Sequence, residues 1–212
     1  MADFRIDIIS DFVCPWSYLG YRRLKQATDQ LGDDYRFDIK WQPFELHPDI
    51  NSQGAEREAY LSKKFDSLEK LTEATHALQQ IGIEEGIQFN FTDKDILPNT
   101  FLAHRLVMIA NQRALGTQLA LELYHAYFTD GRNIGDVDVL QDIAQNIGMK
   151  SEDIEEAFTE KSKIIIEKKI KRFQEVDIVS APTYVIDDKF IIHGAHTPDS
   201  FFKVLTDIAK NK

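Results

Sequence analysis

The chain of 212 residues contains one cysteine, and no run of residues approaches the roughly 20 apolar positions of a membrane-spanning helix. One cysteine cannot form an internal disulfide, so the sequence does not fit a secreted scaffold held together by cross-links. The first residues also lack the basic stretch and apolar run of a secretory leader. We therefore expect a cytoplasmic protein that has no membrane partner.

The sequence also has fewer positively than negatively charged residues. The 25 lysines and arginines are outnumbered by 35 aspartates and glutamates, which gives a formal net charge of −10. Such a chain repels phosphate backbones, so we expect no nucleic-acid partner. His193 and His196 are three residues apart with no further ligand at zinc spacing, and the glycines form no phosphate-binding fingerprint. We therefore expect no metal site.

Hydrophobic residues make up 43% of the chain, enough for a sizeable core, and their spacing predicts an α/β start. Alternating apolar residues predict strands at 4–9 and 35–41. Between them, apolar residues at helical spacing predict a helix that begins after Cys14 and ends at Gly32. The opening is therefore strand, helix, strand.

The middle of the chain is predicted to be helical. One long apolar stripe runs over residues 61–81, and a second, over 101–110, ends near Gly116. Shorter helices are expected at 119–128, at 137–147 and after Ser151 as N-cap, with the apolar positions of 164–173 extending or following the last one.

Strand signals then return as a hairpin of residues 183–186 and 190–192. The chain closes with a helix that has Thr197 as N-cap and Pro198 at its first position. No linker rich in Pro, Gly and Ser separates these parts. We therefore predict one α/β domain, residues 1–52 and 173–212, interrupted by a helical insertion domain, residues 53–172.

Cys14 stands where the first strand gives way to the first helix. Unpaired backbone N–H groups and the positive end of the helix dipole stabilise a thiolate at such a position and lower its pKa. Pro15 suits the first helical position. The alternative is a small buried hydrophobic side chain without reactivity. We expect an ionised, accessible thiol.

Four segments in one order give the sequence a recognisable pattern: residues 11–20 (DFVCPWSYLG), 43–48 (PFELHP), 99–106 (NTFLAHRL) and 179–186 (VSAPTYVI). With this layout the chain resembles the thioredoxin superfamily, and more closely its DsbA-like branch, including the FrnE-like and 2-hydroxychromene-2-carboxylate isomerase group. The likeness spans essentially the whole chain. It implies a thioredoxin-like fold with a large all-helical insertion.

The resemblance also implies roles for individual residues. Cys14 matches the family's nucleophile, with Pro15 and Trp16 shaping its surroundings. Pro182 matches the proline that is cis in this superfamily, and the backbone of Ala181 would then bind substrate across from the sulfur. The alternative for Pro182 is a proline that starts an edge strand.

Asn99 and His104 resemble polar substrate-binding residues on a helix above the family's active site. Five positions separate them, so they lie near 140° apart on an ideal helix. His104 is equally compatible with a histidine whose hydrogen bonds are satisfied inside the core.

Ser17 departs from the family pattern, because FrnE-like oxidoreductases commonly carry a second cysteine at this position. A serine hydroxyl cannot resolve a mixed disulfide, which excludes a dithiol mechanism. It can donate a hydrogen bond to the sulfur and favour the thiolate, so we place Ser17 with Cys14 in the catalytic pair.

The first reading of function is therefore a monothiol thiol-disulfide oxidoreductase. It needs no tightly bound cofactor, and glutathione or another low-molecular-weight thiol, or a protein thiol or disulfide, serves as partner; a homodimer stays open. The second is an enzyme like the kappa-class glutathione transferases or the isomerases, although Gly194 is followed by Ala195 and His196 where the kappa class has a polar residue and an acid. The third is a non-enzymatic holdase that binds peptides.

Overall fold

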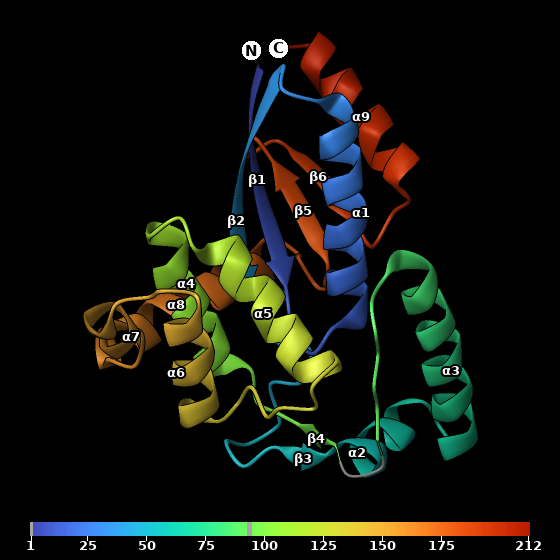
Figure 1. Cartoon of the computed structure of the whole chain (residues 1–212), viewed down its shortest axis with the longest axis vertical. Coiled ribbons are helices and arrows are strands. Elements are labelled where there is room, and N and C mark those ends of the chain that lie inside the picture. The colour runs from blue at the N-terminus through green and yellow to red at the C-terminus, as the bar shows by residue number, and fades with distance from the viewer. Residues whose placement is uncertain (1, 93–94) are drawn as a thin grey trace.

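The computed structural model describes residues 2–92 and 95–212 and shows a sheet with helices packed around it (Figure 1). The strands are β1 (Ala2–Ser10), β2 (Tyr35–Pro43), β3 (Ala55–Glu56), β4 (Ile96–Leu97), β5 (Thr183–Ile186) and β6 (Phe190–His193). The helices are α1 (Pro15–Leu31), α2 (Arg57–Lys64), α3 (Leu68–Glu85), α4 (Phe101–Gln112), α5 (Gly116–Phe128), α6 (Val137–Asn146), α7 (Ser151–Ala157), α8 (Glu160–Glu175) and α9 (Pro198–Lys210).

The main sheet has four strands in the order β2-β1-β5-β6. β1 runs parallel to β2 and antiparallel to β5, which also pairs with β6 as the predicted hairpin. α1 and α9 lie side by side along one face of this sheet (Figure 1). This α/β arrangement, with helices inserted between β2 and β5, confirms the predicted thioredoxin-like fold class.

Local sequence sets the ends of the two helices that cover the sheet. Cys14 occupies the N-cap position of α1 with Pro15 as its first residue, and Gly32 ends the helix with φ 73°. In α9, the Thr197 side chain accepts a hydrogen bond from the backbone N–H of Ser200. Both starts lie where the sequence predicts them.

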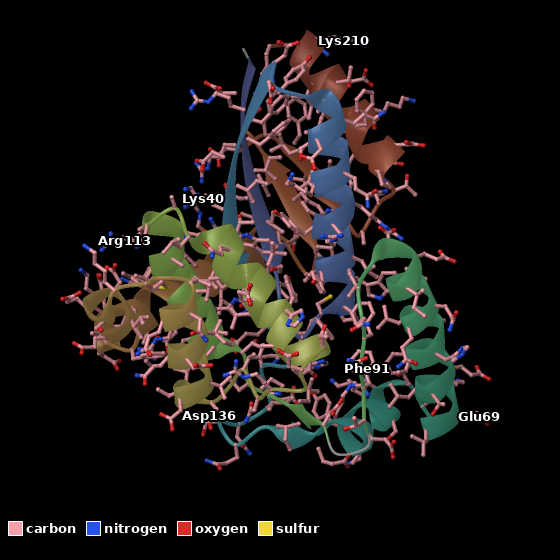
Figure 2. All side chains as sticks on the ribbon, viewed as in Figure 1. Lys40, Glu69, Phe91, Arg113, Asp136 and Lys210 are labelled. Atoms are coloured by element: carbon pink, nitrogen blue, oxygen red, sulfur yellow. The ribbon has the colours of Figure 1, made fainter. Side chains whose placement is uncertain are left out.

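The apolar stripe over 61–81 is not one helix, and that prediction is wrong. α2 ends at Lys64, Asp66 has φ 64°, and the Ser67 side chain caps α3 by accepting from the backbone N–H of Lys70. A cap and a left-handed residue override the continuous apolar pattern. Figure 2 shows Glu69, near the start of α3, pointing away from the rest of the chain, whereas Leu71 and Leu78 of the same helix are buried.

Other details of the insertion also differ from the prediction. β3 and β4 form a second, two-stranded antiparallel sheet, so the insertion is not purely helical. The N-cap of α7 is Lys150 and not Ser151. α4 ends at Gln112, and Gly116 begins α5. α8 continues across the expected domain boundary at 172/173.

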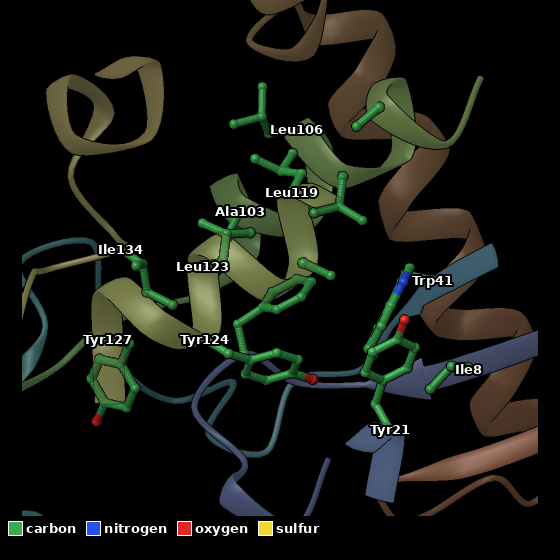
Figure 3. Packing of buried hydrophobic residues seen from close by; sticks show 14 of the residues in the cluster. Ile8, Tyr21, Trp41, Ala103, Leu106, Leu119, Leu123, Tyr124, Tyr127 and Ile134 are labelled. Carbon is green, nitrogen blue, oxygen red and sulfur yellow. The ribbon is translucent and has the colours of Figure 1, made fainter. Parts of the chain in front are cut away.

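The insertion and the sheet share one hydrophobic core. Tyr124 of α5 is fully buried, and its ring lies 5.8 Å from that of Trp41 in β2, which in turn lies 5.2 Å from Tyr21 of α1. Figure 3 shows these rings gathered near Ile8 where α5 meets the sheet. The aromatic contacts therefore fix the insertion against the amino end of α1. Across the part of the chain that the structure describes, no helix is both long and apolar enough to cross a membrane.

Candidate functional site

Cys14 and Ala181 are 167 positions apart in the sequence and meet in the structure. The thiol donates a hydrogen bond to the Ala181 carbonyl oxygen, with Sγ and O 3.6 Å apart. The peptide bond between Ala181 and Pro182 is cis, and β5 begins at the next residue, Thr183. The end of β1 with α1 holds one side of this contact, and the segment before β5 holds the other.

The Cys14 side chain is buried, with 3% of its surface exposed. Burial raises the pKa of the Cys14 thiol from its ordinary value of 9.0 to about 11. The side chain and backbone of Ser17 and the backbone of Trp16 lower this pKa, whereas the carboxylate of Asp11 raises it. The helix N-terminus therefore acts in the expected direction, but desolvation outweighs it. The predictions of a lowered pKa and an accessible thiol are wrong.

Ser17 lies in the first turn of α1 and is fully buried. Its hydroxyl oxygen has no conventional hydrogen-bond partner within residues 2–92 and 95–212, while its proximity to Cys14 lowers the pKa of the thiol. A buried hydroxyl without a competing partner can turn toward a sulfur that becomes charged. Ser17 thus lies beside the sulfur, and its place in a catalytic pair with Cys14 stays a prediction.

Two buried tyrosines approach the same sulfur, and neither of them was identified from the sequence as part of the site. The charge of a Cys14 thiolate raises the pKa of both Tyr124 and Tyr184, in addition to the larger effect of burial. The Tyr124 hydroxyl donates to Ser10 Oγ at 3.2 Å. The Tyr184 hydroxyl lies against Gly20, where a Cβ would come within 2.2 Å of it. Side chains two positions apart in a strand share a face. Because the resemblance placed Pro182 at the active site, this alternation could have placed Tyr184 on the same face, toward α1.

Asp11 acts on the Cys14 thiol through its charge and also lies close to His104. The backbone N–H of Leu46 donates to Asp11 Oδ2 at 2.7 Å, and Asp11 Oδ1 lies 3.7 Å from His104 Nε2. His104 Nε2 is also 2.9 Å from the carbonyl oxygen of Phe44, to which it donates. Both side chains are at most 2% exposed. His104 therefore lies beneath the turn that carries Cys14, as a buried histidine with internal partners.

The segment 44–47 adds two further titratable groups at this end of the sheet. Burial raises the pKa of Glu45, while His104 lowers it. Burial also lowers the pKa of His47. The resemblance highlighted this segment without assigning either residue a role.

The structure does not bring Asn99 to the sulfur in the same way. Its side-chain amide donates to the Ile50 carbonyl at 2.8 Å, and its Oδ1 accepts from the backbone N–H of Phe101 at 3.0 Å. These contacts tie the start of α4 to the loop after β2. They give Asn99 a structural use, and its predicted contact with substrate stays a prediction.

Two apolar side chains lie exposed near the buried sulfur. Trp16 is 46% exposed two residues after Cys14, and Val179 is 76% exposed two residues before Ala181. Pro15 is half-buried and Pro182 is buried. Each of the two segments that meet at the site therefore carries one exposed apolar side chain. Among the residues that the structure describes, no group of three or more His, Cys, Asp or Glu side chains is placed to hold a metal ion.

The chain is similar to proteins of known sequence and known structure. The sequence model for the DSBA-like thioredoxin domain matches residues 5–206. The protein YwbO of Bacillus subtilis is 27% identical over 209 residues, which are 98% of this chain and 98% of the relative.

Solved structures of similar fold include a probable DsbA oxidoreductase, SCO1869, from Streptomyces coelicolor, with TM-score 0.88, 22% identity and coverage of 99% of this chain and 91% of that one. A 2-hydroxychromene-2-carboxylate isomerase has TM-score 0.69 and 16% identity, covering 97% and 95% of the two chains. The cytosolic disulfide reductase DsbM from Pseudomonas aeruginosa, solved with GSH, has TM-score 0.65 and 15% identity, covering 97% and 99%.

Proposed function

Because the chain belongs to the DSBA-like thioredoxin family, we propose that it is a cytoplasmic thiol-disulfide oxidoreductase that uses Cys14 as a single nucleophile. The observation that carries the proposal is the contact of the Cys14 sulfur with the Ala181 carbonyl next to Pro182, at the amino end of α1. The contact supports the proposal because a backbone segment beside the sulfur can pair with an incoming substrate chain.

The reaction has two thiol-exchange steps. The Cys14 thiol loses its proton, and the thiolate attacks one sulfur of an external disulfide. A bond forms between the two sulfurs, the external S–S bond breaks, and one thiolate leaves. An external thiol then attacks the mixed disulfide, forms a new external disulfide and returns Cys14 to the reduced state. Ser17 has no sulfur and takes no part in the second attack.

The buried thiol places a condition on this chemistry. At neutral pH a thiol whose pKa is about 11 is almost entirely protonated, and only 3% of the residue surface meets solvent. We propose that substrate binds over Trp16, Pro15 and Val179, pairs with Ala181 and separates that carbonyl from the thiol. Ser17 then takes over as the hydrogen-bond donor to the thiolate. Substrate binding by His104 stays a prediction, because its Nε2–H is donated to the Phe44 carbonyl.

Intact-mass analysis tests the proposal. The reduced protein is incubated with oxidised glutathione, and we expect one glutathione adduct per chain, on Cys14, that free thiol removes. Cys14→Ser is the matched control and should acquire none. Ser17→Cys should convert the site to a dithiol and add oxidase activity toward a reduced peptide. Absence of an adduct on the folded wild-type protein, with adduct formation after unfolding in urea, would refute the nucleophile assignment.

The burial of Cys14 favours a second candidate, in which the site works without nucleophilic attack by the sulfur. The isomerase among the similar folds supports a transferase or isomerase of this kind. Accumulation of a glutathione conjugate of an electrophile, dependent on Cys14 but without a protein adduct, would identify it. Binding of unfolded polypeptide that survives Cys14→Ala would instead identify the holdase.

A further inference from the structure

A cavity of about 530 Å³ lies between the carboxyl-terminal half of α8 and the face of the main sheet that α1 and α9 leave free. Its lining residues come from both elements and from the segment after α8: Arg5, Asp7, Gln42, Lys169, Arg172, Phe173, Val176, Ile178, Val185, Asp188 and Ile191. Asp7 pairs with Val185 in the sheet, whereas the neighbouring pair, Ile8 and Tyr184, points toward α1. The cavity is therefore on the other side of the sheet from Cys14.

The acidic groups of the cavity are already engaged. Arg5 forms ion pairs of 2.8 Å with Asp7 and 3.1 Å with Asp188. The Gln42 side chain also donates to Asp7. One arginine thus lies between two carboxylates, and this part of the wall keeps a net charge of −1.

Two cations on α8 are not paired in this way. Lys169 Nζ donates to the neutral Oε1 of Gln42 at 2.9 Å. Within residues 2–92 and 95–212, neither Lys169 nor Arg172 forms a salt bridge. Burial lowers the pKa of Lys169, Asp7 raises it, and the charges of Arg5 and Arg172 lower it further. With three cations and two carboxylates the lining carries a net charge of +1, in a chain whose net charge is −10, and the two cations without an acidic partner both lie on α8.

The rest of the lining is apolar, and part of it is uncovered. Val176 is 59% exposed and Ile191 is 54% exposed, on opposite sides of the cavity. Phe173, Ile178 and Val185 continue the apolar wall. A ligand that fills this space would cover these side chains while an anionic group meets the two cations.

We propose that this cavity binds an amphipathic carboxylate, with the carboxylate at Lys169 and Arg172 and an aliphatic or aromatic body against Val176 and Ile191. The volume falls in the range of small-molecule sites. The site is separate from the chemistry proposed for Cys14 and does not depend on it.

Titration calorimetry with decanoate, below its micelle concentration, tests the proposal. We expect saturable binding of one decanoate per chain. Arg172→Gln and Lys169→Met should each weaken it by about tenfold, since each removes a charge-assisted contact. Val176→Ser should weaken it by about fourfold through loss of apolar cover.

Lys168→Met and Lys171→Gln are the matched controls, because both residues are exposed on α8, neither lines the cavity, and each change removes one positive charge. They should leave the dissociation constant unchanged. Urea unfolding curves check that every variant is folded. The proposal is overturned if decanoate does not bind, if the control variants weaken binding as much as the cavity variants, or if decylammonium binds as well as decanoate.

Discussion

The surroundings of Cys14 and of Lys169, on opposite sides of the same sheet, show how burial and neighbouring charges act on an ionisable group. Burial favours the uncharged form of both, so it raises the pKa of the thiol and lowers that of the ammonium group. They differ in their neighbours. Asp11 carries the same sign as a thiolate and adds to the effect of burial at Cys14. At Lys169, Asp7 opposes the effect of burial, while Arg5 and Arg172 add to it. A helix N-terminus alone is therefore not enough to activate a thiol.

Truncation of an apolar side chain should cost more stability on the α1 side of the sheet than on the cavity side. Ile8→Ala should lower the free energy of unfolding by about 3 kcal/mol, because Ile8 is fully buried on the α1 side of the sheet and its truncation leaves a cavity. Ile191→Ala, on the cavity side, should cost less than about 0.5 kcal/mol, since Ile191 is 54% exposed. Urea unfolding measures both, and equal losses would mean that the two faces do not differ.

A second, smaller effect concerns pH. The unfolded chain loses the Cys14 proton near pH 9, whereas the folded chain retains it until about pH 11. Stability from this group is therefore complete below pH 9 and is lost as pH rises toward 11. Between pH 8 and pH 10 the wild-type protein should lose on the order of 1 kcal/mol more than Cys14→Ala does. Parallel urea midpoints for the two proteins would contradict the raised pKa.

The smallest effect is expected at Ser17. Ser17→Ala should raise the pKa of Cys14 further and slow its alkylation at a fixed pH, because Ser17 lowers that pKa. The free energy of unfolding should change by less than about 1 kcal/mol, since the buried hydroxyl has no conventional partner to lose among the described residues. Cys14→Ala, which has no thiol, is the control for alkylation at other residues. Faster alkylation of Ser17→Ala would show that the hydroxyl does not support the thiolate.

Much of the sheet domain follows from local sequence. Thr197 and Pro198 start α9 where their side chains and ring predict it, and the hairpin around Asp187 and Asp188 pairs as expected. The break between α2 and α3 was also encoded, in the cap at Ser67. The apolar spacing over 61–81 favours one continuous helix, whereas the cap at Ser67 favours a break, so the two signals conflict.

The electrostatics of the site could not be predicted in the same way. Desolvation of Cys14 comes from residues that only the tertiary fold brings near it, such as Ala181 and Tyr124. The resemblance placed His104 above the active site, whereas its contact with Asp11 and its burial depend on the segment after β2. Local sequence located the thiol but did not determine its protonation.

The rate of Cys14 alkylation by iodoacetamide as a function of pH tests most directly whether desolvation outweighs the helix N-terminus. For the folded protein the rate should still rise about tenfold for each pH unit from 7 to 10, toward an inflection near 11, whereas the urea-unfolded chain should level off above pH 9. Circular dichroism at each pH confirms that the first sample is folded. A folded protein whose rate levels off at or below pH 8.5 would contradict the raised pKa of Cys14.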